Sequence, residues 1–236
     1  FSMFKDDESV LRRLAQIKRD NKAAFCSYVE KTTGRKLNPD SIFDVQVKRL
    51  HEYKRQQLNV LNILNDYNCL LENPDADFVP KTYIFASKAA PGYYMAKQII
   101  KLIWCLGEEI RQNPKISDKL SVVFLEDYRV TLSEILMPAS EISEQISLAG
   151  TEASGTGNMK LMLNGAVTMG TYDGANVEIC EQVGRDNIFI FGMSANDVNI
   201  AKSNKYNPES ICNSDGRISG AVNRMYSGIN GAKFDE

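Results

Sequence analysis

Histidine, tryptophan and paired cysteines are scarce in this sequence. It has one histidine (His51), one tryptophan and five scattered cysteines in 236 residues. One histidine and cysteines without C-x-x-C spacing cannot assemble a metal cluster, so we expect no metal site. An odd number of dispersed cysteines argues against a disulfide framework and indicates a reducing compartment, the cytoplasm. The sequence has no stretch of about 18 apolar residues, so we expect no transmembrane helix.

The chain also lacks a signal peptide and an excess of either charge. It begins with FSMFKDD, without an initiator methionine or the apolar core of a secretory signal, and we expect a piece of a longer protein. A net charge of −2 gives no general attraction to nucleic acid or acidic membranes, so we expect neither as a partner. Hydrophobic residues at 43% and charged residues at 25% are typical of a soluble globular protein.

Apolar runs typical of buried strands alternate with segments of helical periodicity. This alternation predicts an α/β, Rossmann-like parallel sheet flanked by helices. We expect a helical lead-in over residues 1–40, the Rossmann-like domain over 41–200 and a partial helical tail over 201–236 that packs loosely or frays. The expected strands are 42–47, 82–86, 120–125, 166–170 and 187–191, and the expected helices are 9–31, 52–71, 92–112, 156–163 and 175–183.

The segment Glu152–Lys160, EASGTGNMK, combines a small-residue loop with a helix start. Thr156 is the expected N-cap, and Lys160 follows about one turn inside the helix. Unpaired backbone N–H groups and the positive end of the helix dipole attract a phosphate at such a place. The lysine adds a point charge or, when deprotonated in a dry pocket, an amine that forms a Schiff base. The combination indicates a phosphorylated cofactor that carries a carbonyl group.

The same segment departs from both familiar nucleotide-binding templates. Gly155 and Gly157 are too close for the G-x-x-x-x-G-K-[ST] spacing. Lys160 occupies the place of the third glycine of G-x-G-x-x-G. An ordinary glycine-rich turn followed by a solvated lysine remains an open alternative.

A second candidate is the run Lys48–Arg55, which places four permanent cations around His51. It is interpreted as a phosphate site, a solvated charged face or a nuclear-targeting patch. Three segments follow predicted strands at their carboxyl ends, where ligands bind in open α/β sheets. These segments, 87–92, 126–129 and 150–160, all contain cations, and their convergence favours an anion site.

Five blocks together resemble the glycogen (α-1,4-glucan) phosphorylase family. The segment Glu152–Lys160 resembles its pyridoxal-phosphate lysine signature. Four further blocks resemble the family in the same order, and the resemblance extends from about Ser9 to Val198. These blocks are Asp44–Gln56 (DVQVKRLHEYKRQ), Lys88–Tyr93 (KAAPGY), Phe124–Val130 (FLEDYRV) and Asp173–Glu178 (DGANVE).

The resemblance implies a role for each candidate residue. It implies pyridoxal 5′-phosphate held by Lys160 as a Schiff base, with no metal. It assigns catalytic roles to Lys48, Arg49, Lys54 and Lys160; cofactor contacts to Lys48, Tyr128, Arg129, Thr156, Gly157 and Lys160; and substrate contacts to Arg49, Lys54, Glu152, Ser154 and Gly155. Within this set, Lys48 faces the cofactor phosphate, Arg49 and Lys54 hold the substrate phosphate, and Glu152 accepts hydrogen bonds from glucose hydroxyls.

The implied protein is the C-terminal half of an enzyme with two Rossmann-like domains, whose N-terminal half is absent. The implied reaction is phosphorolysis of α-1,4-glucan (glycogen, starch or maltodextrin) by inorganic phosphate to glucose 1-phosphate, with retention. Such a protein is a cytoplasmic homodimer, and we expect this isolated chain to be inactive. Ser87 and Asp127 stand where the family often has glycine and asparagine, and neither change removes a key group.

Two other interpretations remain open. A nucleotide-sugar glycosyltransferase of the same architecture needs no Schiff-base lysine, and Lys160 in its full motif argues against it. A non-catalytic binding fragment is the third interpretation, because the family's active site lies between two half-domains.

Overall fold

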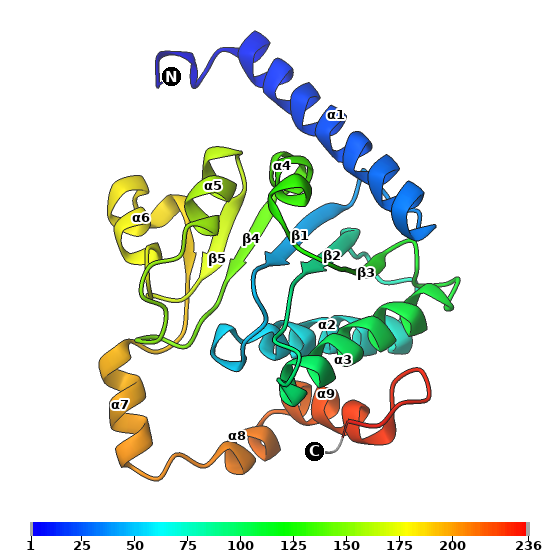
Figure 1. Ribbon diagram of the computed structural model, residues 1–236, viewed down its shortest axis with the longest axis vertical. Coiled ribbons are helices and arrows are strands. Elements are labelled where there is room, and N and C mark those ends of the chain that lie inside the picture. The colour runs from blue at the N-terminus through cyan, green and yellow to red at the C-terminus, as the bar shows by residue number, and fades with distance from the viewer. Residues whose placement is uncertain (1, 235–236) are drawn as a thin grey trace.

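Six parallel strands form one sheet in the order β3-β2-β1-β4-β5-β6 (Figure 1). The computed structural model describes residues 2–234 of the chain. Each neighbouring pair of strands runs parallel, and the chain reverses its direction across the sheet beside β1. The expected Rossmann-like α/β fold is confirmed. The strands are β1 (Ile42–Val47), β2 (Lys81–Ala86), β3 (Leu120–Leu125), β4 (Ile142–Gln145), β5 (Val167–Gly170) and β6 (Phe189–Ile190).

Helices cover both faces of this sheet, as Figure 1 shows. The set α1, α4, α5 and α6 lies on one side, and α2, α3 and α9 lie on the other. The α-helices are α1 (Glu8–Thr33), α2 (Gln56–Glu72), α3 (Tyr94–Arg111), α4 (Val130–Ala139), α5 (Gly157–Leu163), α6 (Asn176–Val183), α7 (Ala195–Ser203), α8 (Pro208–Ser214) and α9 (Gly216–Ser227), and 3-10 turns span Ser2–Phe4, Glu52–Lys54 and Arg185–Asn187.

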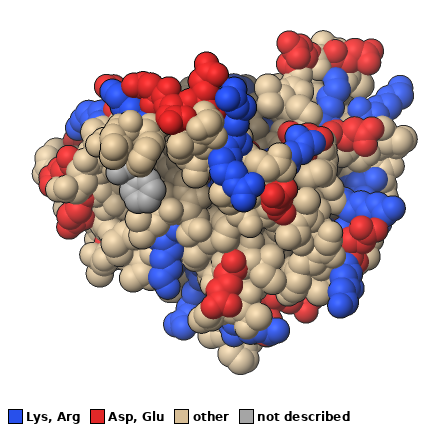
Figure 2. Space-filling view, turned by 90° about the horizontal axis from the view of Figure 1, so that it is seen from above, with Lys and Arg blue, Asp and Glu red and all other residues tan. Residues whose placement is uncertain are grey.

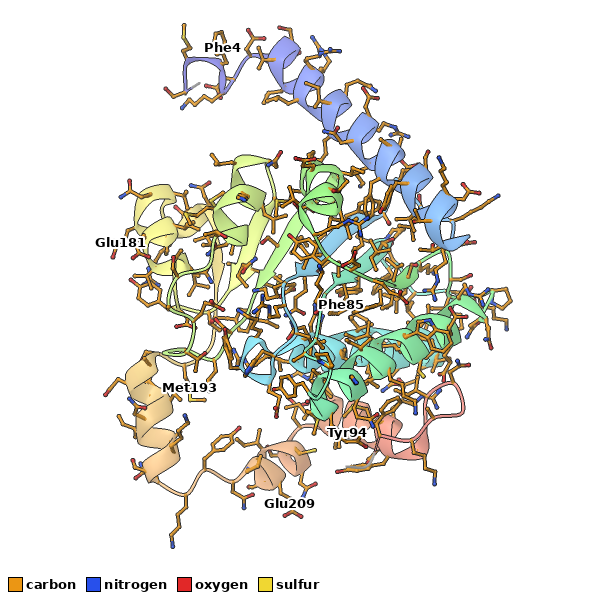
Figure 3. The ribbon with its side chains drawn as sticks, in the orientation of Figure 1. Phe4, Phe85, Tyr94, Glu181, Met193 and Glu209 are labelled. Atoms are coloured by element: carbon orange, nitrogen blue, oxygen red, sulfur yellow. The ribbon has the colours of Figure 1, made fainter. Side chains whose placement is uncertain are left out.

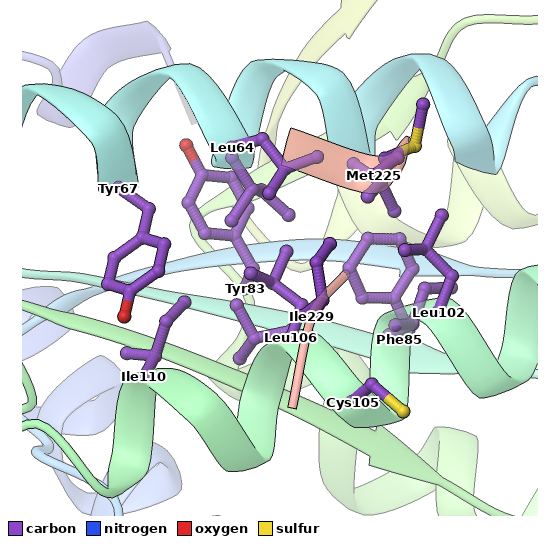
Figure 4. Packing of buried hydrophobic residues seen from close by; sticks show 14 of the residues in the cluster. Leu64, Tyr67, Tyr83, Phe85, Leu102, Cys105, Leu106, Ile110, Met225 and Ile229 are labelled. Carbon is purple, nitrogen blue, oxygen red and sulfur yellow. The ribbon is translucent and has the colours of Figure 1, made fainter. Parts of the chain in front are cut away.

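The larger core lies between the sheet and the helices α2, α3 and α9 (Figure 4). Tyr83 and Phe85 of β2 are almost fully buried there against Leu106 of α3. In Figure 3, Phe85 lies at the centre of the molecule, whereas Glu181 and Glu209 lie at its periphery. Burial of one such apolar side chain contributes about 1.5–3 kcal/mol. This core holds the central strands, and therefore their carboxyl ends, in place.

The second core lies on the opposite face, under α1 and α4. Phe25 and Val29 of α1 pack there with Leu132 and Leu136 of α4. The Phe25 ring meets Phe43 of β1 edge-on, with ring centroids 5.9 Å apart. The two cores enclose β1–β3 on both faces, which explains why most side chains of these strands are buried.

Helix α1 confirms the amphipathic helix expected over residues 9–31. Asp7 caps it by accepting hydrogen bonds from the backbone N–H groups of Ser9 and Val10, at 2.9 and 3.2 Å. Only its second half packs on the sheet, because Leu11 and Leu14 in the first half are exposed. The apolar stripe that the sequence predicts is thus covered along part of its length.

Three elements were not expected from the sequence: the helix α4, the strand β4 and the helix α7. Strand β4 carries Ser143 and Glu144, which are buried although they are polar. Helix α4 contains Pro138 in its last turn. A four-residue strand with three polar residues lacks the apolar run that identifies a buried strand, so periodicity missed it.

The boundaries of the helix expected over residues 52–71 are also different. Arg55 has a left-handed φ of 56°, which ends the 3-10 turn Glu52–Lys54 and separates it from α2. Helix α2 therefore begins at Gln56. The cationic run Lys48–Arg55 lies before the helix, at the carboxyl end of β1.

The segment after residue 203 contains the helices α8 and α9. Ala221 and Met225 of α9 are buried against α2 and α3. Glu109 of α3 pairs with Arg224 and accepts a hydrogen bond from the backbone N–H of Asn230 at 2.6 Å. These contacts attach α9 to the larger core, while the division of the chain at residues 40 and 200 stays a prediction.

The surface charges are mixed. Figure 2 shows Lys and Arg interspersed with Asp and Glu on one face of the molecule. All five cysteines are free. Among the described residues, no helix is long and apolar enough to span a membrane.

Candidate functional site

A cavity of about 400 Å³ opens at the carboxyl ends of β1, β4 and β5. Its walls come from segments that follow strands: the end of β1 with Lys48 and Lys54, the segment after β3, the β4–α5 loop and the β5–α6 loop. Carboxyl ends of parallel strands meet at one edge of a sheet, and this edge beside the topological switch is where such folds bind ligands. The volume is within the usual range for a small-molecule site.

The cavity brings together all the predicted site residues except Arg49. Arg49 is exposed and is not among the lining residues. Of the three segments expected to converge, 126–129 and 150–160 contribute to the lining, while 87–92 does not. The predicted residues that line the cavity are Lys48, Lys54, Tyr128, Arg129, Glu152, Ser154, Gly155, Thr156, Gly157 and Lys160.

Lys48 lines the cavity directly after the end of β1. Its Nζ donates a hydrogen bond to Oε1 of Gln145 at 2.7 Å. Burial, assisted by the positive charge of Lys54, lowers the pKa of Lys48 to about 8. Burial thus makes the charged form of the Lys48 side chain unfavourable. An anion bound beside Nζ would stabilise that charged form.

Lys54 and Glu152 form an ion pair across the cavity. The sequence interpretation gave them separate ligands, so their mutual contact is a new finding. Burial, the largest single effect, lowers the pKa of Lys54, but the hydrogen bonds and charges of Glu152 and Tyr53 together outweigh burial and hold the pKa above its ordinary value. The partners are half-buried and 98 residues apart in the sequence.

Lys160 and Thr156 are the groups of the signature segment that have no side-chain partner. Lys160 is exposed, and among the described residues nothing hydrogen-bonds to its ammonium. Thr156 is the N-cap residue of α5 as expected, but its side chain makes no capping hydrogen bond. Thr156 has φ −120° and ψ −22° rather than the extended conformation typical of an N-cap residue whose side chain caps the helix. Its hydroxyl is left for another partner.

Tyr128 and Arg129 line the wall between β3 and α4. Burial raises the pKa of Tyr128. Arg129 pairs with Asp127, which also pairs with Lys88 at 2.8 Å. Hydrogen bonds from Lys88 and Arg129 lower the pKa of Asp127. The segment 87–92 is thus linked to the site through Asp127, whose partner Arg129 lines the cavity.

Two buried carboxyl groups lie beneath Lys48, on neighbouring strands. Glu144 of β4 has a pKa raised to about 7 by burial, although the charge of Lys48 opposes the increase. Asp44 of β1 also has a raised pKa, first because it is buried and second because Glu144 is close. One oxygen of Asp44 has no hydrogen-bond partner in the described structure. Sequence reasoning gave neither residue a role.

Two of the lining residues that sequence reasoning missed are Asp173 in the β5–α6 loop and Asn176 at the start of α6. Asp173 and Asn176 were quoted there only as parts of a family block. Asn176 Nδ2 donates to the backbone oxygens of Gln145 and Thr171, both at 3.0 Å, and its Oδ1 accepts from Asn158 at 2.9 Å. The available signal was their position, because polar residues directly after a buried strand lie at the ligand-binding edge.

Comparisons with known proteins show the family of this chain. A family model described as carbohydrate phosphorylase matches residues 1–235. The chain is 50% identical over 223 residues to the brain form of glycogen phosphorylase from Ovis aries, across 94% of this chain and 26% of that protein. It is 50% identical to the muscle form from Bos taurus over 224 residues, with 95% and 27% covered. The human muscle form is 48% identical over 226 residues, with 96% and 27% covered.

The chain thus spans about a quarter of the length of the curated relatives it matches. Because the family model matches almost every residue, this chain belongs to the carbohydrate phosphorylase family.

Proposed function

We propose that this chain is the cofactor-binding part of an α-glucan phosphorylase. The complete protein would cleave the terminal α-1,4 bond of a glucan with inorganic phosphate. In this reaction C1 of glucose exchanges its bond to the glucan oxygen for a bond to phosphate, and the released glucan oxygen takes up a proton. The observation that carries the proposal is the cavity, which places the unpartnered Lys160 beside Lys48, Lys54 and Glu152.

The residues present fit pyridoxal 5′-phosphate. Lys160 presents a free amine to the cavity, and Thr156 presents a free hydroxyl near the first N–H groups of α5, which have no acceptors within the helix. Tyr128 adds a partly buried aromatic wall. When bound, the cofactor supplies a phosphate group that exchanges a proton with inorganic phosphate. Lys160 would anchor it, and Thr156, Gly157, Lys48, Tyr128 and Arg129 would contact it.

The cations of the Lys48–Arg55 segment would allow two phosphate groups to approach each other. Two anions repel strongly in a partly dry cavity, so closely placed cations are needed to offset their charge. Lys48 would face the cofactor phosphate, and Lys54 with Arg49 would hold inorganic phosphate. Arg49 is exposed outside the lining, so its side chain must turn toward the cavity to do this.

The sugar would bind to Glu152, Ser154 and Gly155 on the β4–α5 loop. Glu152 would give up its pairing with Lys54 and accept hydrogen bonds from glucose hydroxyls. Asp173 is the other carboxylate in the lining. Both of its oxygens accept hydrogen bonds from the protein, Oδ2 from Ser147 and Oδ1 from Gly150. A pair of free carboxyl groups, as glycosidases use, is therefore not available, which favours phosphate as the acid and nucleophile.

The remaining parts of the proposal concern the whole protein. Its substrates would be inorganic phosphate and glycogen, starch or maltodextrin, and its product glucose 1-phosphate. The relatives named above are glycogen phosphorylases, which favours glycogen among these glucans. A homodimer in the cytoplasm is expected from the family resemblance.

Reduction with borohydride tests the cofactor assignment. The complete protein, incubated with pyridoxal phosphate and reduced, should carry a pyridoxyl group on Lys160, found by peptide mapping. Lys202, an exposed helical lysine on α7, provides the internal control and should remain unlabelled. Label elsewhere, or none on Lys160, would contradict the proposal and would favour the nucleotide-sugar glycosyltransferase or the binding fragment.

A further inference from the structure

The carboxylate of Asp173 accepts three hydrogen bonds from the β4–α5 loop. Its Oδ2 accepts from the hydroxyl of Ser147 at 2.7 Å and from the backbone N–H of Glu152 at 3.0 Å. Its Oδ1 accepts from the backbone N–H of Gly150 at 2.9 Å. Asp173 is 6% exposed, so these bonds replace water almost completely. A buried carboxylate with both oxygens satisfied holds its donors strongly.

Two neighbours hold the same loop from other directions. The guanidinium of Arg55 donates to the backbone oxygens of Ile146 at 2.7 Å and Ser147 at 3.2 Å, and its charge interacts with that of Asp173. The hydroxyl of Thr171 donates to the Ser147 oxygen at 2.6 Å. The start of the β4–α5 loop is thus fixed between the cationic segment and the β5–α6 loop.

The residues after Asp173 fix the next part of the loop. The backbone N–H of Ala175 donates to the Ser154 oxygen at 2.7 Å. A Cβ atom on Gly174 would lie 2.5 Å from that same oxygen and 3.2 Å from Cγ of Glu152, so the two loops are in direct contact. The backbone around Glu152 is therefore held on both sides, by Asp173 at its N–H and by Ala175 two residues later.

We propose that Asp173 is a positioning residue that fixes the backbone of Gly150–Ser154 and so orients the Glu152 carboxylate toward the sugar. This inference rests on the proposed function. Asp173 acts through Glu152 and not on the substrate, because both of its oxygens are used by the loop.

The variant Asp173→Asn keeps the size of the side chain but removes its charge and one acceptor oxygen. In the complete protein, kcat/KM for glucose 1-phosphate in glucan synthesis should fall by about 10- to 100-fold, as expected for a misplaced binding group. The pyridoxal-phosphate content and its absorption spectrum should stay unchanged, because Lys160 is on α5. Asp186→Asn, the same change at an exposed position of the Arg185–Asn187 turn, should leave kcat/KM unchanged.

A double-variant cycle shows whether Asp173 acts through Glu152. If it does, the variant carrying both Asp173→Asn and Glu152→Gln should be no more than about threefold worse than Glu152→Gln alone. Losses that multiply would overturn the proposal, as would loss of cofactor in proportion to activity. Should Asp173→Asn fail to fold, Ser147→Ala removes one donor and leaves the charge. It should lower kcat/KM by about twofold to fivefold without changing cofactor content, and no loss at all would contradict the proposal.

Hydrogen exchange gives a readout that is independent of activity. In the cofactor-free complete protein, Asp173→Asn should speed exchange of the Gly150 and Glu152 amides at least about tenfold, with exchange in β2 unchanged. Unchanged exchange at both amides would overturn the proposal. If instead the parent protein shows neither phosphorolysis nor label on Lys160, the proposed function fails while the exchange result still decides the role of Asp173 in the loop.

Discussion

Nζ of Lys48 lies 2.7 Å from Oε1 of Gln145, which joins the end of β1 to the end of β4. This contact crosses the position where the chain reverses its direction across the sheet. It brings the cationic segment to within one residue of the β4–α5 loop that carries Glu152. The site is therefore assembled by strand order, from segments about 100 residues apart in the sequence.

Replacement of Lys160 by alanine should abolish turnover of the complete protein. The change removes the only amine of the α5 segment and with it the proposed anchor of the cofactor, while an exposed lysine contributes little to stability. The absorption of bound pyridoxal phosphate should disappear, and the unfolding midpoint without cofactor should be unchanged. Turnover that persists without an added amine would contradict the assignment.

Glu144 should make the free energy of unfolding decrease as the pH rises, the opposite of the effect of most carboxyl groups. Its pKa is raised from 4.5 to about 7, so in this range the folded protein keeps a proton that the unfolded chain has released. The free energy of unfolding should consequently fall as the pH rises through this range, by about 3 kcal/mol at most.

The variant Glu144→Gln isolates this effect because it cannot titrate. Urea unfolding at about pH 5 and about pH 8 should show a smaller decrease for Glu144→Gln than for the parent. Glu181→Gln, an exposed position on α6, should keep the parent's dependence. Equal decreases in Glu144→Gln and the parent would show that Glu144 does not hold the proton.

Gly174→Ala should destabilise the protein by about 1–3 kcal/mol. Gly174 has a φ of +54°, and an added Cβ would lie 2.5 Å from the backbone oxygen of Ser154. Gly216→Ala is the matched control, because a Cβ there meets nothing within 4 Å and the φ of Gly216 lies outside the left-handed region. Equilibrium unfolding should separate the two variants, and equal stabilities would argue against close contact of the two loops.

The isolated 236-residue chain should release no glucose 1-phosphate from glycogen and phosphate, even with added pyridoxal phosphate. The chain spans about a quarter of the length of its relatives. The family resemblance implies that the active site lies between two half-domains. The complete protein assayed in parallel provides the positive control. Measurable release by the chain alone would show that its cavity is sufficient for catalysis.

The sequence predicted most of the sheet because its signal is local. Strands β2 and β3 are largely apolar runs between two helical layers, and β1 nearly alternates apolar and polar residues, so the local pattern identified all three. Strand β4 was missed because Ser143 and Glu144 are buried for reasons that arise only from their neighbours. The signal of the segment Glu152–Lys160 is also local, because its glycines, Thr156 and Lys160 are adjacent in the sequence. Thr156 and Lys160 could therefore be singled out.

The relations between segments could not be predicted in the same way. The pairing of Lys54 with Glu152 joins residues 98 positions apart, and the bonds of Asp173 reach back 21 to 26 positions. Such contacts depend on strand order and loop conformation, which residue spacing does not encode. The exposed position of Arg49, next to the buried Leu50, likewise follows from the direction of the backbone after β1.

In the ion pair between Lys54 and Glu152, each side chain occupies the group that the other's proposed substrate would bind. Under the proposed roles, phosphate that draws Lys54 away leaves Glu152 unpaired, and a sugar then binds it without first breaking the pair. Thermodynamic reciprocity requires that the sugar assist phosphate by the same factor. The two substrates would therefore bind with positive cooperativity within a single site.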